Sequence, residues 1–442
     1  MTVEVPNAQL LQEVASAWPT LWVNPKYKAG AIDGGDLPVN PSDVLDAKRN
    51  WERLAPLLAA CFEELEATGG VIRSELLELK ALRHALEYGS PEYGRLFMKA
   101  DSELPVAGSI KARGGVYEVF LFAEGLARQN GLLADGGDIR KLAGAEARDF
   151  FSGYTIAVGS TGNLGLSVGI AARALGFKAT VHMSFDAKQW KVDRLLRLGV
   201  EVIKHEADYT TAVENARVVA EADPSIYFVD DEKSRHLFLG YSVAAYELAE
   251  QLKDLGVTVD ENNPLFLYLP CGIGGAPGGV TFGAKAVFGD NVHAFFVEPV
   301  QSPCALVHMM SGSEELVSVY DVGLTNKTEA DGMAVARMSA FVATVMREML
   351  AGIYTAPDAD LLKALLSAYE AEGLRLEPSA TAALFGPEFL LRHPRGEEFC
   401  AQRGMRDKMG RATHILWTTG GSFVPDEQFE SFLAQARSLV QR

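Results

Sequence analysis

The sequence predicts an α/β fold with mostly parallel sheets, arranged in two domains. From about residue 154 onward, apolar β-branched runs of strand length alternate with amphipathic stretches of helix length. Strands separated by helices need crossover connections, which place parallel strands side by side and cover the sheet with helices. The 442 residues are 48% hydrophobic, which is enough for one large core or two ordinary ones.

The same alternation predicts the elements in order. Strands are expected at 154–158, 178–183, 201–204, 226–229, 265–269 and 293–297. Helices are expected between them at 163–174, 187–198, 209–222, 241–255 and 279–288. Beyond residue 300 the chain is predicted to be mainly helical, at 334–350, 359–371 and 379–392, with one late strand at 413–418. The first hundred residues are predicted to be mostly helical, at 44–68 and 75–88.

The late strand predicts how the domains are assembled. Because it lies far from the main series, one domain is expected to be built from both ends of the chain. We predict a large domain of residues 1–103 and 241–442, with a helical N-terminal extension, and a smaller inserted α/β domain of residues 104–240. Open α/β sheets bind ligands at the carboxyl ends of their strands, so the active site is expected in the cleft between the domains.

The composition disfavours several kinds of partner. The net charge of −17 repels nucleic-acid backbones and anionic membranes. We see neither an apolar run of roughly 18 residues, as a bilayer span needs, nor a secretory signal at the N-terminus. The four cysteines lack C-x-x-C spacing, which indicates a reducing compartment and argues against structural zinc. A cytoplasmic protein is expected.

The first candidate site is the loop G-S-T-G-N at residues 159–163, between a predicted strand and a predicted helix. Its small residues leave the backbone N–H groups of the helix start accessible to an anion, and Asn163 adds a side-chain donor. Such loops are also common as plain connections in which Ser160 or Thr161 caps the helix. Taken alone, the loop favours the plain connection.

The second candidate site is the loop P-C-G-I-G-G-A-P-G-G at residues 270–279. So many glycines are costly in chain entropy, and they are expected where backbone wraps closely around a phosphate. A dinucleotide fingerprint is the rival reading, and Glu298 mimics its acidic residue. However, Pro277 stands where G-x-G-x-x-G needs glycine or alanine, so a monophosphate is favoured.

The third candidate site surrounds Lys111 in S-I-K-A-R-G-G, residues 109–115. A lysine is usually a solvated surface group. Lys111 instead lies between glycines and is flanked by the apolar segments 104–107 and 116–117. A lysine that is desolvated in an apolar cleft loses its proton more easily and becomes a nucleophile for carbonyl carbon.

Together these strings resemble the fold type II pyridoxal-phosphate enzymes, which include threonine and serine dehydratases and serine racemase. Residues 109–114 are similar to the S-x-K-x-R-G of that family, and the S-T-G-N loop, the glycine loop and Thr419-Gly420 follow in the family's order. D-D-E-K-S-R-H-L-F-L-G-Y-S at 230–242 and R-L-E-P-S-A at 375–380 are most similar to bacterial members that act on D-serine. The resemblance runs from W-V-N-P at 22–25 to the end of the chain.

The resemblance implies pyridoxal 5'-phosphate as the cofactor, with Lys111 as its Schiff-base lysine. Asn163 would contact the pyridine hydroxyl, and Thr419 would face the pyridine nitrogen. A hydroxyl there does not force the nitrogen to be protonated, which favours loss of a β-leaving group over transamination. The phosphate would be held by the backbone N–H groups of Gly272, Ile273, Gly274, Gly275 and Ala276.

The implied reaction is α,β-elimination, in which D-serine is dehydrated and deaminated to pyruvate and ammonia. The substrate carboxylate is expected on Ser160, Thr161, Gly162 and Asn163, at a helix N-terminus that favours negative charge. Lys111, Asp231 and Thr161 are the expected catalytic residues. For Asp231, a helix-capping or solvated acid is an equal alternative.

Three other functions stay open. One is an L-serine/L-threonine dehydratase or another fold type II lyase, another is a nucleotide-dependent oxidoreductase, and the third is a cofactor-binding protein without turnover. In relatives similar to serine racemase a glutamate helps to bind a cation, and Glu298 matches it. The later aspartate of that pattern is absent and Cys304 lies near its place, so a weakly bound potassium or sodium ion is expected. The relatives imply a monomer.

Overall fold

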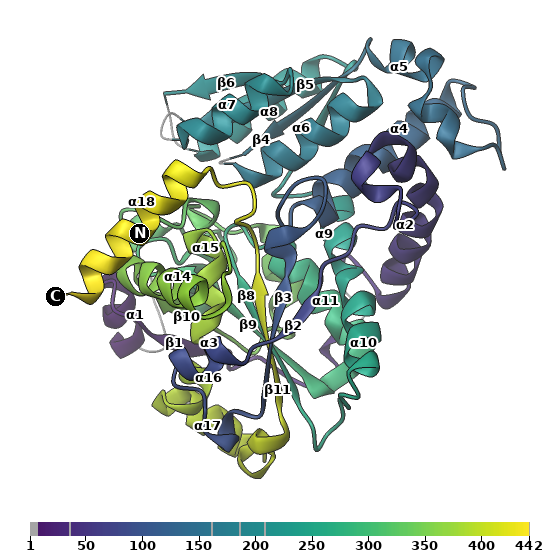
Figure 1. The fold of residues 1–442 in the computed structure, drawn as a ribbon. Helices are drawn as coiled ribbons and strands as arrows, with labels where there is room; N and C mark the ends of the chain where they lie inside the picture. The colour runs from purple at the N-terminus through teal and green to yellow at the C-terminus, as the bar shows by residue number, and fades with distance from the viewer. Residues whose placement is uncertain (1–7, 35–36, 161, 185–186, 207–208, 442) are drawn as a thin grey trace. The chain divides into compact units, whose positions relative to one another are not determined.

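The computed structural model describes residues 8–34, 37–160, 162–184, 187–206 and 209–441. The chain divides into two compact units (Figure 1). Unit 1 comprises residues 1–41, 74–103 and 244–442, and unit 2 comprises residues 42–73 and 104–243.

Unit 1 is built on a seven-stranded sheet in the order β1-β10-β9-β8-β11-β3-β2. The five inner strands pair in parallel, and the two edge strands, β1 and β2, pair antiparallel. Every residue of β8, β9 and β11 is buried, as expected for a parallel sheet covered on both faces. The strands are β1 (Leu21–Val23), β2 (Leu76–Glu78), β3 (Arg95–Ala100), β8 (Leu265–Pro270), β9 (Val292–Pro299), β10 (Gly352–Ala356) and β11 (Thr413–Thr418).

Helices of unit 1 lie on both sides of this sheet. Figure 1 shows α10 and α11 on one side of the strands and α14 and α18 on the other. The helices are α1 (Ala8–Ala15), α3 (Ala81–Ala85), α10 (Ala244–Asp254), α11 (Gly275–Phe288), α12 (Cys304–Ser311), α13 (Ala340–Met346), α14 (Asp358–Glu372), α15 (Pro378–Thr381), α16 (Gly386–Leu391), α17 (Pro394–Gln402) and α18 (Asp426–Val440).

Unit 2 is built on a four-stranded, wholly parallel sheet in the order β6-β5-β4-β7. Its strands are β4 (Thr155–Gly159), β5 (Lys178–Ser184), β6 (Glu201–His205) and β7 (Ile226–Val229). Its helices are α2 (Pro41–Cys61), α4 (Tyr117–Gln129), α5 (Ala145–Phe151), α6 (Asn163–Leu175), α7 (Gln189–Arg197), α8 (Tyr209–Ala222) and α9 (Arg235–Ser242). Both sheets confirm the predicted α/β class with mostly parallel strands.

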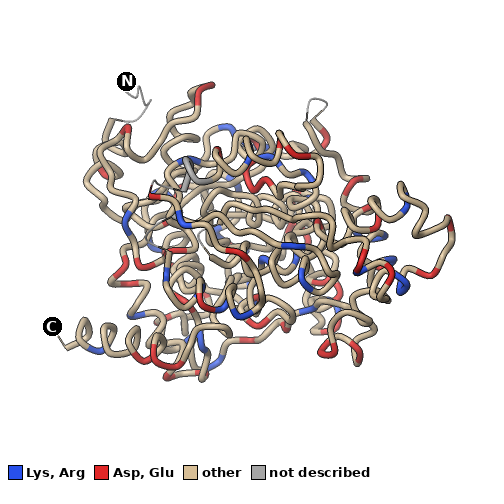
Figure 2. Tube along the Cα trace, turned by 90° about the horizontal axis from the view of Figure 1, so that it is seen from above, with Lys and Arg blue, Asp and Glu red and all other residues tan. Residues whose placement is uncertain are grey.

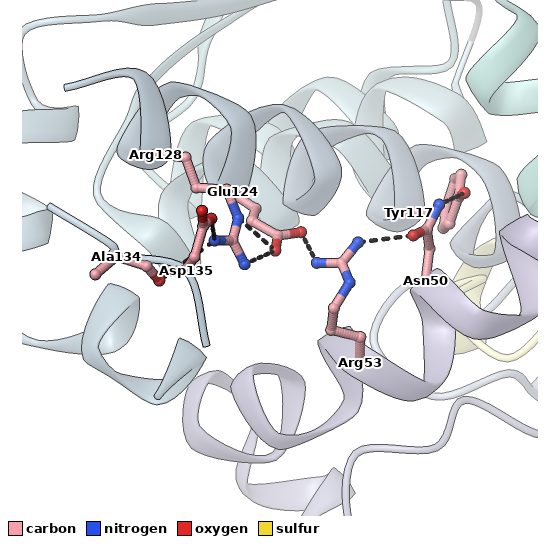
Figure 3. Close-up of polar contacts among 7 residues, drawn as sticks. All are labelled: Asn50, Arg53, Tyr117, Glu124, Arg128, Ala134 and Asp135. Atoms are coloured by element: carbon pink, nitrogen blue, oxygen red, sulfur yellow. Dashed lines mark hydrogen bonds and ion pairs between the residues drawn. The ribbon is translucent and has the colours of Figure 1, made fainter. Parts of the chain in front are cut away.

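Helix α2 clusters with unit 2, although we expected it in the large domain. The reason is a set of contacts with α4 that are distant in sequence. Asn50 donates to the hydroxyl of Tyr117 over 3.0 Å, and Arg53 forms an ion pair with Glu124 (Figure 3). Glu124 also pairs with Arg128 at 2.9 Å.

The Glu124 carboxylate supports a prediction about the stability of unit 2. Its side chain is only 4% exposed, and it neutralises two guanidinium groups that are 38% and 33% exposed. Glu124→Gln should lower the free energy of unfolding by about 1–2 kcal/mol, because it removes the charge that pairs with both arginines. The loss stays this small because the two partly exposed guanidinium groups can be hydrated instead. Thermal melting checks this value. Glu52→Gln, which removes an exposed carboxylate from α2, is the control and should change stability little.

Four predicted helices are wrong. The predicted helix at 379–392 is divided into α15, a 3-10 turn and α16. Residues 75–88 form β2 and the short helix α3 instead of one helix. The predicted helix at 334–350 shrinks to α13, and β10 is an additional strand beyond residue 300. The predicted helix at 241–255 is divided into the end of α9 and α10. Strands β2 and β10 owe their conformation to pairing with β3 and β9, which a local pattern does not reveal.

Charged residues of both signs are interspersed along the described trace (Figure 2). Within the described ranges, every helix is too short or too polar to cross a bilayer.

Candidate active site

Lys111 lies at the start of a π-helical turn, Ala112–Val116, that leads into α4. The hydroxyl of Ser167, in α6, donates to the Lys111 carbonyl over 2.8 Å and so fixes the backbone. The Nζ atom of Lys111 lies 5.6 Å from the centre of the Tyr241 ring, a distance that allows a cation–π contact. Lys111 is half-buried.

Two glycines after Lys111 make these contacts possible. A methyl group at Gly114 would lie 2.4 Å from Cζ of Tyr241, and one at Gly115 would lie 2.6 Å from Oγ of Ser167. Both distances are too short for non-bonded atoms. The G-G pair therefore lets α6 and α9 pack directly against the turn that carries Lys111.

Tyr241 is a buried neighbour of Lys111 that the sequence analysis did not single out. Its hydroxyl is buried without a hydrogen-bond partner among the described residues. Burial raises the pKa of Tyr241 well above its usual value, and the charges of Asp231 and Glu118 raise it further. Tyr241 therefore stays neutral beside Lys111. Its only sequence signal was membership of the F-L-G-Y-S string.

The predicted loop 159–163 and Asp231 lie at one edge of the unit 2 sheet. Strands β4 and β7 pair in parallel with Val158 opposite Val229, and Ser160 and Asp231 each follow two residues later. The Ser160 hydroxyl accepts the N–H groups of Gly162 (3.0 Å) and Gly165 (2.9 Å). Helix α6 begins at Asn163, as predicted, whereas Thr161 lies outside the described residues.

The acids on either side of Asp231 are held by a single arginine. Arg217 donates to Asp230 over 2.8 and 3.0 Å and to Glu232 over 2.8 Å. These ion pairs fix the turn after β7 and leave the half-buried Asp231 between two neutralised carboxylates.

Glu118 ties α4 to the elements that carry Asp231 and Tyr241. It accepts hydrogen bonds from Ser234 (2.5 Å) and Tyr227 (2.9 Å). Burial raises the pKa of Glu118 from 4.5 to about 7, against these two hydrogen bonds, which lower it. Between these two pH values the folded protein therefore holds a proton that the unfolded chain releases.

This titration gives a testable pH dependence. Because the folded state binds the extra proton, its contribution to stability is present below about pH 4.5 and is lost as the pH rises through about 7. The melting temperature of the wild type, relative to Glu118→Gln, should fall between pH 5 and pH 8. A difference that stays constant over this range would refute the assignment. Glu146→Gln, at an exposed acid of α5, controls for general charge effects.

The predicted phosphate loop follows β8 in unit 1. Gly274 takes a left-handed conformation (φ 105°) as the N-cap of α11, so helix α11 begins at Gly275, four residues earlier than predicted. The N–H group of Ser339 donates to the Ile273 carbonyl over 2.9 Å and holds the loop. First-turn N–H groups of a helix have no partner within the helix, so the start of α11 offers donors that an anion can accept.

Thr419 lies at the same edge of the unit 1 sheet as the glycine loop. Strands β11 and β8 pair in parallel with Leu416 opposite Tyr268, so Thr419 and Cys271 are each three residues beyond the pair. The Glu377 N–H group donates to the Gly420 carbonyl over 3.0 Å, which places the R-L-E-P-S-A segment beside Thr419. Thr419 is half-buried.

Glu298, predicted as a cation ligand, is fully buried at the end of β9. Its two oxygens accept the N–H groups of Ala305 and Leu306, each over 2.8 Å, at the start of α12. Burial raises the pKa of Glu298 to about 8. The Cys304 thiol donates to the Gly272 carbonyl over 3.2 Å, so this cluster also supports the glycine loop. Among the described residues, no cluster of three or more His, Cys, Asp or Glu side chains could hold a metal ion.

These residues fit pyridoxal phosphate. Lys111, which is half-buried, offers an amine for its aldehyde, and the start of α11 offers backbone N–H groups for its phosphate. Gly274 shows why the loop needs glycine at this position. Its φ is positive, which L side chains rarely adopt, and an added methyl group would lie 3.0 Å from Val342. The fold and these features together define a pyridoxal-phosphate enzyme of fold type II.

The chain belongs to the family of pyridoxal-phosphate dependent enzymes, whose model matches residues 68–398. It is 74% identical, over 99% of its length and 100% of the relative's, to a Rhizobium leguminosarum protein described as a probable D-serine dehydratase. A Geobacillus stearothermophilus protein with the same description is 49% identical, over 97% of this chain and 94% of its own.

Solved structures share the fold. Escherichia coli diaminopropionate ammonia lyase, determined in complex with D-serine, matches with a TM-score of 0.67 at 19% identity, over 94% of this chain and 96% of its own. A threonine deaminase isoform from Solanum lycopersicum matches with a TM-score of 0.62 at 18% identity, over 98% of this chain and 99% of its own.

Proposed function

We propose that this protein eliminates water and ammonia from D-serine and releases pyruvate, with Lys111 carrying the cofactor. The observation that supports this substrate is near-full-length similarity, at 74% identity, to a protein described as a probable D-serine dehydratase. The local geometry around Lys111 supports the residue assignment.

The chain contributes groups that bind and orient. Pyridoxal phosphate, when bound, withdraws electrons from the α-carbon of an attached amino acid, so that the α-proton and the β-hydroxyl can leave. Lys111 binds it covalently through Nζ, and the residues from Gly272 to Ala276 bind its phosphate. Asn163 and Thr419 contact the ring.

The substrate carboxylate binds at the Ser160–Asn163 loop, where the N-terminus of α6 favours negative charge. Asp231 and Thr161 act on the substrate, and Asp231 serves as the second polar group that a D-amino acid needs if its α-hydrogen points away from Lys111. In support, Asp231 and Ser160 follow neighbouring parallel strands at the same edge.

The finer parts of the proposal rest on family resemblance and composition. They are a weak site for potassium or sodium at Glu298, a monomeric state and a cytoplasmic location. For the domains, the proposal is that the predicted small domain contains Lys111 and that the predicted large domain contains the phosphate loop.

Pyruvate formation from D-serine and from L-serine, measured separately with purified holoenzyme, tests the function. We expect pyruvate from D-serine and little from L-serine. The reverse preference would indicate an L-serine/L-threonine dehydratase. A colourless protein that binds a dinucleotide would indicate an oxidoreductase instead.

A further inference from the structure

Ser102 is a buried residue of unit 1 that the roles assigned so far do not use. It is 1% exposed and lies in the short turn Asp101–Glu103, directly after β3. Strands β3 and β11 pair in parallel with Ala100 opposite Thr418. Ser102 therefore lies at the sheet edge where β11 ends and the chain continues into Thr419.

The side chain of Ser102 contacts the residue before Thr419. Its Oγ atom lies 3.0 Å from Oγ1 of Thr418, which is fully buried. The Thr418 hydroxyl itself donates to the Lys99 carbonyl over 3.0 Å. Because a hydroxyl has a single hydrogen to donate, Ser102 is the donor to Thr418. Two hydrogen bonds in series thus fix the end of β11.

The backbone of Ser102 contacts the same segment beyond Thr419. The Ser422 N–H group donates to the Ser102 carbonyl over 3.3 Å. Between these two contacts, the Gly420 carbonyl accepts the Glu377 N–H group over 3.0 Å. Ser102 therefore binds the chain both before and after Thr419, once through its side chain and once through its backbone.

Gly421 shows how little room this segment has to shift. A methyl group there would lie 2.1 Å from the carbonyl oxygen of Arg375 and 2.8 Å from Cα of Leu376. Both atoms belong to the backbone, so they cannot give way as the end of a flexible side chain would. The segment that contains Thr419 is thus confined by backbone at 375–376 and by the contacts with Ser102.

We propose that Ser102 is a positioning residue for Thr419 and thereby sets the hydrogen bond between the Thr419 hydroxyl and the pyridine nitrogen of the cofactor. This inference deepens the proposed function and rests on it for the contact between Thr419 and the ring. A hydrogen bond weakens steeply as its distance and angle depart from the preferred values, so a small displacement of Thr419 is enough to weaken this one.

The test compares pyridoxal phosphate with 1-deazapyridoxal phosphate, in which a C–H group replaces the ring nitrogen. The apoprotein is titrated with each compound, and binding is followed by the quenching of tryptophan fluorescence. The wild type should prefer pyridoxal phosphate by about ten-fold or more, because the analogue leaves the Thr419 hydroxyl unpaired.

Ser102→Ala should reduce this preference by about five-fold. The loss should come from weaker binding of pyridoxal phosphate, whereas the affinity for the analogue should stay the same within about two-fold. Comparing the preferences of the variant and the wild type cancels any difference in the reactivity of the two aldehydes. A general loss of structure would weaken both compounds equally.

Ser318→Ala is the matched control. Ser318 is another buried serine of unit 1, and its hydroxyl accepts the Tyr320 N–H group over 3.3 Å in a different turn. This variant should lower the melting temperature by a similar amount and keep the wild-type preference. Thr418→Val, which removes the hydroxyl that Ser102 binds, should lose preference as Ser102→Ala does, and Thr418→Ser should retain most of it.

Two outcomes for Ser102→Ala would overturn the inference alone. One is an unchanged preference, and the other is an equal loss of affinity for both compounds, which would indicate a structural role. If Ser102→Ala does not fold, Thr418→Val decides by the same criteria.

Failures of the proposed function have different signatures. A wild type that binds both compounds equally would overturn the contact of Thr419 with the ring nitrogen, and the inference with it. If the wild type makes no pyruvate from D-serine but Ser102→Ala still loses the preference, the proposed reaction fails while the positioning role stands.

Discussion

Lys111→Ala should reduce pyruvate formation from D-serine by on the order of 10³-fold or more. In the proposed function the amine of Lys111 binds the cofactor, so its removal takes away the covalent attachment. Ser167 and Tyr241 contact Lys111 and hold this particular turn in position. Steady-state assays of pyruvate, together with the visible spectrum of the bound cofactor, measure the effect.

The matched control for this variant is Lys178→Ala, at an exposed lysine at the start of β5 in the same unit. It should keep the wild-type rate and spectrum. A Lys111→Ala protein that retains the wild-type spectrum and more than about a tenth of the wild-type rate would contradict the assignment.

Gly274→Ala should weaken binding of pyridoxal phosphate by about ten-fold or more, because it distorts the cradle at the start of α11. Gly274 has a φ of 105°, which L side chains rarely adopt, and an added methyl group would lie 3.0 Å from Cγ1 of Val342. The loop or the Val342 side chain must give by a few tenths of an ångström, and a shift of the loop also moves the N–H groups proposed to bind the phosphate. Titration of the apoprotein with the cofactor measures this change.

Gly289→Ala separates strain from cofactor binding. Gly289 follows the other end of α11, also has a positive φ (60°), and has open space where its methyl group would lie. Both variants should lose about 1–2 kcal/mol of stability from backbone strain. Only Gly274→Ala should also lose affinity for the cofactor, so equal affinities in the two variants would argue against a phosphate site at this loop.

The sequence predicted well those elements that are determined by local pattern. Strand 226–229 and helix 209–222 of unit 2 have the predicted bounds, because each carries its own periodicity and its own end signals. The fold class is confirmed for the same reason. Strand β2 was missed because its three residues depend on β3 for their conformation.

The candidate site was predicted where glycines and small polar residues form recognisable strings. The neighbours that orient those strings were not, because they come from distant parts of the chain. Tyr241 approaches Lys111 from 130 residues later in the sequence, and Ser102 contacts Thr418 across 316 residues. A buried serine directly after a strand gives no local signal that distinguishes it from a solvated one. The placement of α2 in unit 2 was missed for the same reason, since the contacts of Asn50 and Arg53 with α4 are long-range.

The most direct test of the central claim is to reduce the holoenzyme with borohydride, digest it, and locate the modified lysine by mass spectrometry. The account predicts a single pyridoxyl-phosphate adduct on the peptide that contains Lys111. An adduct on another lysine, or a protein that carries none, would contradict it.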